Sequence, residues 1–156
     1  MTTLSKNCLL LASLLFSSQL FAATAAEGGT HAKHASKLVS LPAADLKWVE
    51  IPGTGGIKYA NVRGNLTGKG PYEAFVIFPA GKDNPFHTHS QNLPTVVLKG
   101  TFYAVIDGKR VEYPAGSFYN LPAKLSHYSG CNKGEDCLLF QYQADHFDLL
   151  PQTPKP

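Results

Sequence analysis

Two closely spaced histidines are the residues of this sequence best suited to do chemistry. His87 and His89 are separated by a single residue in the stretch PFHTHSQNLP. On an extended segment side chains alternate between two faces, so both imidazoles would point the same way. Neutral imidazole is a good ligand for Zn, Cu, Fe and Ni, and the pair is therefore a chelating arrangement. No Asp or Glu follows within ten residues, so any carboxylate ligand must come from elsewhere.

Short strands are the elements that must position this pair. Runs rich in aromatic and β-branched residues begin at Leu46 and are separated by Gly and Pro. The predicted strands are residues 46–52, 57–64, 72–81, 94–100, 101–108, 117–123 and 137–143. No stretch has sustained helical periodicity, so the pattern predicts an all-β sandwich or barrel. Lys99-Gly100 and Asp107-Gly108 are predicted to be hairpin turns.

The segments around the histidines resemble the two motifs of the cupin superfamily. In GKDNPFHTHSQNLPTVVLKG the spacing of the first motif is met by Gly81, His87, His89 and Gly100. In YPAGSFYNLPAKLSHYSG the second motif is matched by Pro114, Gly116, Pro122 and His127. From about Leu46 to Pro151 the chain is similar to a group of small, single-domain bacterial cupins, often described as DUF4437-like.

The resemblance implies a double-stranded β-helix, or jelly-roll, barrel. In such a barrel His127 would join His87 and His89 around one divalent transition metal, which could be Fe, Zn, Cu, Ni or Mn. Leu93 occupies the position of the usual cupin glutamate. Gln91 shares strand parity with the histidine pair and is the first candidate to replace the missing oxygen ligand. A water ligand, with Gln91 as a solvent-facing turn residue, is the alternative.

Two functions fit these residues. The first is an exported, metal-dependent oxygenase or lyase that acts on a small molecule in the barrel. The second is a non-catalytic periplasmic protein that binds or senses a small molecule. Tyr119 and Leu93 are the predicted substrate contacts, and no catalytic residue is assigned. Three neutral imidazoles leave the ion its full charge and supply no oxygen ligand. The preference of the site for hard metals that favour oxygen ligands, such as Mn, should therefore weaken.

The first residues have the outline of a secretory signal peptide. Lys6 precedes an apolar run from Cys8 to Phe21, and Ala23-Thr24-Ala25 offers a small-x-small cleavage site. The run is short and uneven for a membrane span. The expected organisation is a signal peptide at 1–25, a flexible segment at 26–40, a cupin domain at 41–151 and a tail at 152–156, in a periplasmic or secreted protein.

Cys131 and Cys137 are the cysteines that remain after such cleavage. In an oxidising compartment they are expected to form a disulfide that restrains a hairpin loop, and a soft metal site is the alternative.

The expected partners are a small-molecule ligand and a second copy of the chain. The formal net charge is only +3, with scattered basic residues, so neither nucleic acid nor a membrane is expected as a partner of the mature protein. Phe75 and Ile77 make one face of their strand apolar, and Val76 and Phe78 do the same for the other. Two apolar faces on one strand indicate that one side is covered by a second layer or by a partner subunit. The resemblance to cupins, which often pair through such outer faces, implies a homodimer.

Overall fold

The computed structural model describes residues 38–154. The predicted signal peptide and most of the predicted flexible segment lie outside the described residues. Residues 38–40 are exposed and belong to no strand. A single 3-10 turn, Ala43–Asp45, is the only helical element of the described part of the chain. No helix there is long and apolar enough to cross a membrane.

Strands make up the rest of the described fold. They are β1 (Val49–Glu50), β2 (Lys58–Arg63), β3 (Tyr72–Phe78), β4 (Asp83–Thr88), β5 (Leu93–Lys99), β6 (Thr101–Ile106), β7 (Lys109–Pro114), β8 (Phe118–Leu121), β9 (His127–Cys131), β10 (Cys137–Gln143) and β11 (Leu150–Pro151).

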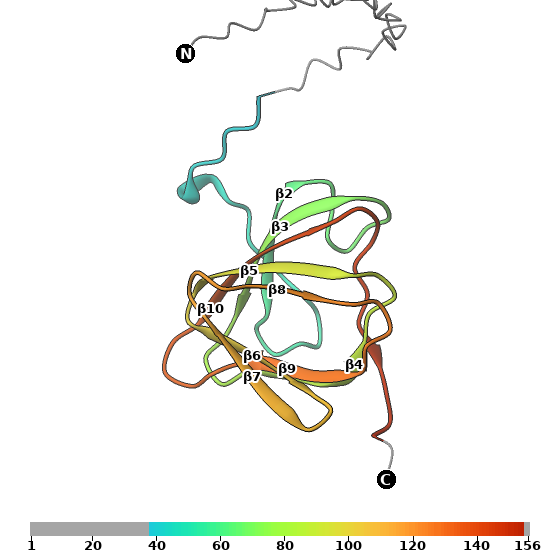
Figure 1. Ribbon diagram of the computed structural model, residues 1–156. Helices are drawn as coiled ribbons and strands as arrows, with labels where there is room; N and C mark the ends of the chain where they lie inside the picture. The colour runs from blue at the N-terminus through green and yellow to red at the C-terminus, as the bar shows by residue number, and fades with distance from the viewer. Residues whose placement is uncertain (1–37, 155–156) are drawn as a thin grey trace, which may run out of the picture. The chain divides into compact units, whose positions relative to one another are not determined.

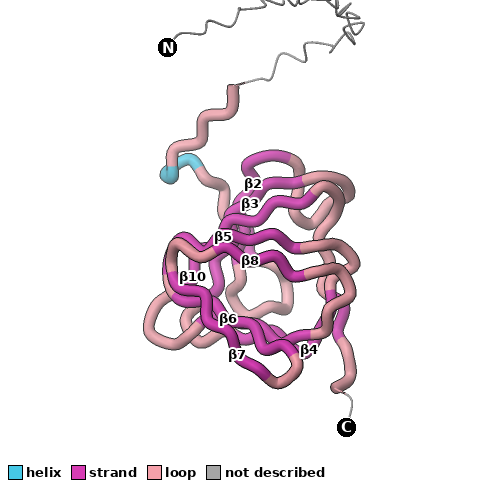
Figure 2. Tube along the Cα trace, in the orientation of Figure 1, coloured by secondary structure: helices cyan, strands magenta, loops and turns pink. Residues whose placement is uncertain are grey.

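The strands form two antiparallel sheets that face each other (Figures 1 and 2). One sheet has the order β1-β2-β3-β10-β5-β8 and the other β11-β4-β9-β6-β7. The chain passes repeatedly from one sheet to the other, which is the jelly-roll arrangement. The predicted all-β jelly-roll fold is therefore confirmed.

Alternation along β3 shows how the sequence builds the interior. Tyr72, Ala74, Val76 and Phe78 are buried between the sheets, whereas the residues between them are only partly covered. The outward side of β3 is also apolar, as the sequence indicated. There Phe75 lies edge-on to Phe140 of β10, with ring centroids 5.2 Å apart.

One of the two predicted hairpin turns is present. Asp107 and Gly108 join β6 to β7 with positive φ values of 49° and 74°, as a tight two-residue hairpin requires. The Lys99-Gly100 prediction is wrong, because β5 and β6 belong to different sheets. Gly100 instead turns the chain between the sheets, and a Cβ there would lie only 2.8 Å from the backbone oxygen of Asp136.

Strand β7 was not among the predicted runs. Its residues are exposed except for Tyr113, so it lacks the apolar alternation by which strands are found in a sequence. It forms because the tight turn at residues 107–108 folds it back onto β6. Over residues 46–52 the prediction was too long, because a strand was expected along the whole stretch and only Val49–Glu50 pairs with β2.

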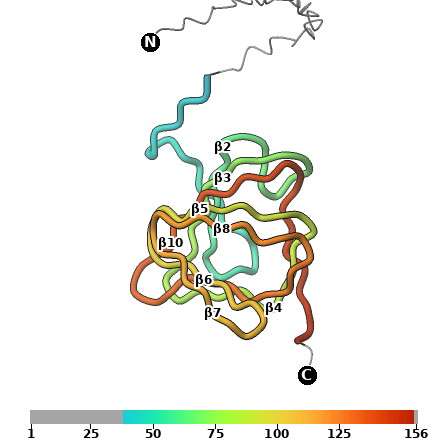
Figure 3. The backbone as a smooth tube through the Cα atoms, viewed as in Figure 1, coloured from blue at the N-terminus to red at the C-terminus, as the bar shows by residue number. Residues whose placement is uncertain are grey.

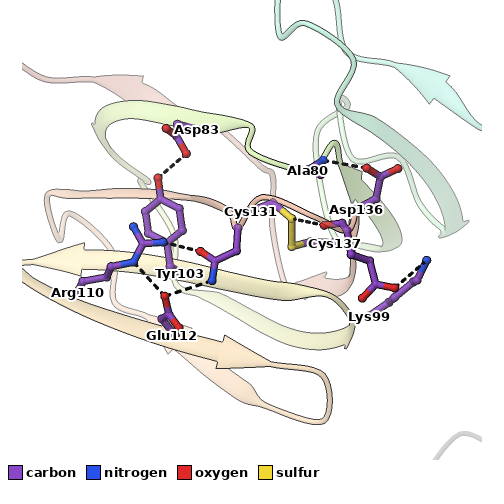
Figure 4. The surroundings of a disulfide bond; sticks show 11 residues. Ala80, Asp83, Lys99, Tyr103, Arg110, Glu112, Cys131, Asp136 and Cys137 are labelled. Atoms are coloured by element: carbon purple, nitrogen blue, oxygen red, sulfur yellow. Dashed lines mark hydrogen bonds and ion pairs between the residues drawn. A yellow bond between two sulfur atoms is a disulfide. The ribbon is translucent and has the colours of Figure 1, made fainter.

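The predicted disulfide between Cys131 and Cys137 is present (Figure 4). Both residues are almost fully buried. The bond does not restrain a hairpin, because Cys131 ends β9 in one sheet and Cys137 begins β10 in the other. It therefore closes a short crossing between the sheets, and the alternative of a soft metal site does not apply.

Candidate metal centre

Pairing of β4 with β9 brings the three histidines together. His87 of β4 lies directly across from His127, the first residue of β9. His89 lies just beyond the end of β4, two residues from His87 and on the same face. The ring centroids are 4.2 Å apart for His87 and His127, 4.8 Å for His87 and His89, and 5.4 Å for His89 and His127. All three side chains are buried, and one nitrogen from each lies within 4.8 Å of the others.

Backbone carbonyl groups fix the orientation of each ring. The Nδ1 atom of His87 donates to the Pro85 oxygen at 2.7 Å, and that of His127 donates to the Leu125 oxygen at 2.9 Å. The Nδ1 atom of His89 donates to the oxygen of Asp148 at 2.5 Å. A carbonyl oxygen only accepts, so each Nδ1 carries the proton of a neutral ring. Each Nε2 is then left with a free lone pair.

These lone pairs face one another without a donor between them. The Nε2 atoms of His87 and His89 are 3.2 Å apart, and the buried Nε2 of His127 has no hydrogen-bond partner. A Zn–N bond is about 2.0–2.1 Å long, so two nitrogens on one tetrahedral ion lie about 3.3 Å apart. Converging acceptors and an orphaned buried nitrogen fit a cation. The three residues could therefore hold a metal ion.

Burial keeps the three rings neutral. Burial, together with the nearby rings of His127 and His89, lowers the pKa of His87 to about 4, against the opposing effect of the bond to Pro85. Burial likewise lowers the pKa of His89 and of His127. Neutral imidazole is the form that binds metals, so the site is ready for an ion near neutral pH.

An apolar cavity of about 170 Å³ adjoins the histidines. His89 and His127 form part of its wall, and both sheets contribute the rest. Its lining residues include Leu93, Phe102, Tyr119, Leu121 and Phe147, together with Asn84, Ser129 and Gln141. No Lys, Arg, Asp or Glu is among them. The cavity suits a small, uncharged and largely apolar molecule next to the histidines.

Residues 74–141 match the family described as the cupin domain, a stretch that begins in β3, ends in β10 and includes all three histidines. This match identifies the stretch as a cupin domain. Comparison with curated proteins gave no significant match.

Several solved structures resemble this protein in fold. The polyketide cyclase RemF from Streptomyces resistomycificus has a TM-score of 0.63 and 16% identity, over 76% of this chain and 88% of that chain. An RmlC-like cupin from Ralstonia eutropha JMP134 has a TM-score of 0.60 and 19% identity, over 74% of each chain. KdgF from Halomonas sp. has a TM-score of 0.54 and 15% identity, over 67% of this chain and 91% of that chain. At these identities the likeness concerns the fold alone.

Leu93 and Tyr119 both lie in the cavity wall of this cupin. Leu93 is 4% exposed, so an apolar side chain stands where the first cupin motif usually has a glutamate. Tyr119 is buried and lies nearly parallel to Phe102, with ring centroids 5.9 Å apart. Burial raises the pKa of Tyr119, so its hydroxyl keeps its proton. These two residues are placed to shape the cavity, and their contact with a substrate stays a prediction.

Gln91 is not brought to the three histidines, contrary to the expected replacement of the oxygen ligand. Its amide nitrogen donates to Asp145 Oδ2 at 3.3 Å. It lines a separate surface groove that includes Phe118 and Tyr142. The physical reason is that β4 ends at Thr88, so strand parity no longer holds two residues beyond His89.

A C-terminal segment completes the site, a role that the sequence analysis did not predict. We call residues 144–152 the C-terminal strap. Its short strand β11 pairs with β4, so that Leu150 lies opposite Thr88. In Figure 3 the red C-terminal part of the chain passes beside β4. The backbone N–H of Gln152 donates to the backbone oxygen of Phe86 at 2.9 Å, which anchors the C-terminal end of the strap. The strap therefore runs alongside the strand that carries His87.

The strap contributes to both the histidines and the cavity. Its Asp148 carbonyl orients His89, and its Phe147 ring lies 5.5 Å from the His89 ring. The Asp148 carboxylate accepts a bond from the Ser90 backbone at 2.8 Å. Although burial opposes it, bonding to Ser90 lowers the pKa of Asp148 and keeps the group ionised. Phe147 and Leu149 form part of the cavity wall.

Proposed function

We propose that this cupin binds one divalent transition metal through His87, His89 and His127 and uses it on a small, largely apolar molecule in the adjoining cavity. The convergence of three unprotonated Nε2 atoms beside an uncharged cavity, two of whose wall residues are His89 and His127, carries this proposal. Three protein ligands leave coordination positions open, which is typical of catalytic sites rather than closed structural ones. A polyketide cyclase among the similar structures supports a role on such a molecule.

The bound ion would supply Lewis acidity to an oxygen atom of the ligand, or oxygen chemistry as an Fe or Cu oxygenase would require. The chain itself orients the ion through the three rings, excludes water with the apolar wall and places the ligand beside the open positions. Neutral nitrogen donors favour Fe, Zn, Cu or Ni, and they favour Mn less. An oxygenase or a lyase is the reaction type that we propose.

Non-catalytic binding or sensing is the second candidate function. Leu93 favours it, because an apolar residue replaces the carboxylate of the first motif. The cavity wall contains no carboxylate that could act as a general base. In this role the ligand would be held mainly by the apolar wall, with or without the ion.

A pair of metal-binding probes tests the proposed function. The cobalt-loaded protein is titrated with benzohydroxamic acid and with acetohydroxamic acid, which differ in a phenyl ring. Both should change the visible spectrum of the ion, and the ring should tighten binding at least tenfold because it is buried in the apolar cavity. The same titration of metal-free protein, followed by NMR, is the control.

The outcomes separate the two functions. An unchanged spectrum would show that the ion has no open position and would contradict the first proposal. Equal affinity for the two probes would contradict a role for the cavity. Affinity for benzohydroxamic acid that is the same with and without cobalt would favour the non-catalytic function.

We further propose that the protein is exported to the periplasm or secreted and belongs to the DUF4437-like group. The signal-like first 25 residues support export. The buried disulfide supports it as well, since such bonds persist in oxidising compartments. Neither nucleic acid nor a membrane is proposed as a partner of the mature chain.

A homodimer is the proposed assembly, with the outer face of the larger sheet as its interface. A row of apolar residues crosses five strands of that face: Ala60, Phe75, Phe140, Val96 and Phe118. Phe118 is 63% exposed and Tyr142 is 54% exposed, and covering them with the same face of a second copy would remove both from water. Sedimentation velocity should show a dimer that Phe118→Lys weakens, and a monomeric wild-type protein would contradict the proposal.

A further inference from the structure

Gln141 is the cavity residue whose polar group the rest of the fold leaves unused. It lies on β10, where alternate residues face inward, and it is paired with Ala74 on one side and Thr95 on the other. The side chain is only 5% exposed and forms part of the cavity wall. Neither atom of its amide is hydrogen-bonded within the described residues, and neither is among the fully enclosed atoms that lack a partner. The amide is therefore reachable from the cavity.

Three other polar side chains of the wall, those of Asn84, Ser129 and Thr54, already have partners. The Asn84 amide donates to the Ser129 hydroxyl at 3.0 Å. The Thr54 hydroxyl donates to the Ile51 oxygen at 2.6 Å. Apart from the histidines and Tyr119, the rest of the wall is apolar or internally bonded, whereas the Gln141 amide has no partner in the described part of the chain. A buried amide without a partner is costly, so its presence points to a partner that arrives with the ligand.

Gln141 faces the histidines from the opposite sheet. It belongs to the sheet that contains β3, β10 and β5, whereas His87 and His127 belong to the sheet that contains β4 and β9. A molecule in the cavity could therefore meet the ion on one side and an amide on the other. An amide offers two N–H donors and one oxygen acceptor, which suits a neutral carbonyl or hydroxyl group.

We propose that Gln141 is a specificity-determining residue that hydrogen-bonds an oxygen function of the ligand. The ligand is then a neutral molecule with an apolar body, a metal-binding oxygen at one end and a carbonyl or hydroxyl group at the other. A charged group at the end of the ligand away from the ion is disfavoured, because no ionised side chain lines the cavity to pair with it. For the end of the ligand that binds the ion, this inference rests on the proposed function.

Acetophenone and ethylbenzene test the inference, since they differ in a carbonyl group and are otherwise alike. Binding of each to metal-free protein is measured by NMR titration. In this form the histidines offer only acceptor atoms to the cavity, so a carbonyl needs another donor. In Gln141→Met, which keeps the length of the side chain, the ratio of the acetophenone Kd to the ethylbenzene Kd should rise about tenfold over wild type.

Gln143→Met is the matched control. Gln143 lies on the same strand and the same face, is 3% exposed and lines the separate surface groove instead of the cavity. Its substitution should leave the ratio within twofold of the wild-type value. If Gln141→Met does not fold, Gln141→Leu takes its place.

A ratio in Gln141→Met within twofold of wild type would overturn the inference, and so would the failure of both probes to bind wild type. The use of metal-free protein separates this result from the proposed function. A protein that takes up no metal but shows the tenfold shift would retain Gln141 as the polar contact and lose the metal-dependent role. A protein that binds metal but shows no shift would keep the metal-dependent role and lose Gln141 as the polar contact.

Discussion

The His127→Ala variant is expected to purify without a transition metal, whereas the wild-type protein carries about one ion per chain. Removing this ring leaves two imidazoles, and His87 and His89 then lack the third buried nitrogen that faces them. Loss of outer-shell partners alone typically costs 10- to 100-fold in metal affinity, so loss of a ligand should cost at least about 100-fold. Elemental analysis and zinc titration under matched conditions measure the difference.

His146→Ala is the control for this prediction. His146 is the other histidine of the described residues, and its ring bonds to Ser90 and lies 3.2 Å from Asp145. It does not belong to the cluster of three, so its variant should keep close to one ion per chain. Equal metal content in His127→Ala and in the wild-type protein would remove the basis for the site.

Acidification is expected to destabilise the metal-free protein between about pH 6.5 and pH 4. Burial holds the pKa of His87 at about 4 in the folded chain, against an ordinary value of 6.5. In this range the unfolded chain binds a proton that the folded chain does not, so the free energy of unfolding falls as the pH falls. For His87 alone the loss reaches about 3 kcal/mol, and His89 and His127 act in the same direction.

Urea unfolding of the metal-free protein at a series of pH values between 7.5 and 4 measures this loss. The His87→Gln variant should show a shallower decline, because glutamine takes up no proton. Metal-loaded wild-type protein should be more stable than the metal-free form at each pH, and this difference should shrink only near pH 4, where the folded rings begin to bind protons that compete with the ion. An unfolding free energy that is flat from pH 6.5 to pH 4 in metal-free wild type would show that the three rings are not held neutral by burial.

The strands and the histidine pair were predictable because they depend on local periodicity. Aromatic and β-branched alternation identified most strands, and period two alone placed His87 and His89 on one face. His127 required the family resemblance. Its position opposite His87 depends on the register between β4 and β9, which lie far apart in the sequence.

Other parts of the site could not be predicted, for different physical reasons. Gln91 was expected to follow strand parity, but the strand had already ended and a carboxylate outside the cavity holds its amide. Asp148 orients His89 with a backbone carbonyl, which every residue type possesses. Gln141 lies in an ordinary strand run. The lack of a hydrogen-bond partner for its amide can be seen only when both sheets that enclose the cavity are in place.

The hydrogen bond between His89 and the Asp148 carbonyl determines when all three rings can be oriented as the chain folds. Two of the three rings are fixed by oxygens two positions upstream of them, and these contacts exist as soon as each local segment has formed. The third ring waits for a residue 59 positions downstream. A nascent chain that has emerged only as far as β10 thus has two oriented donors and one loose one. If the site binds an ion as proposed, all three oriented rings would be available to it only after the chain has returned along β4.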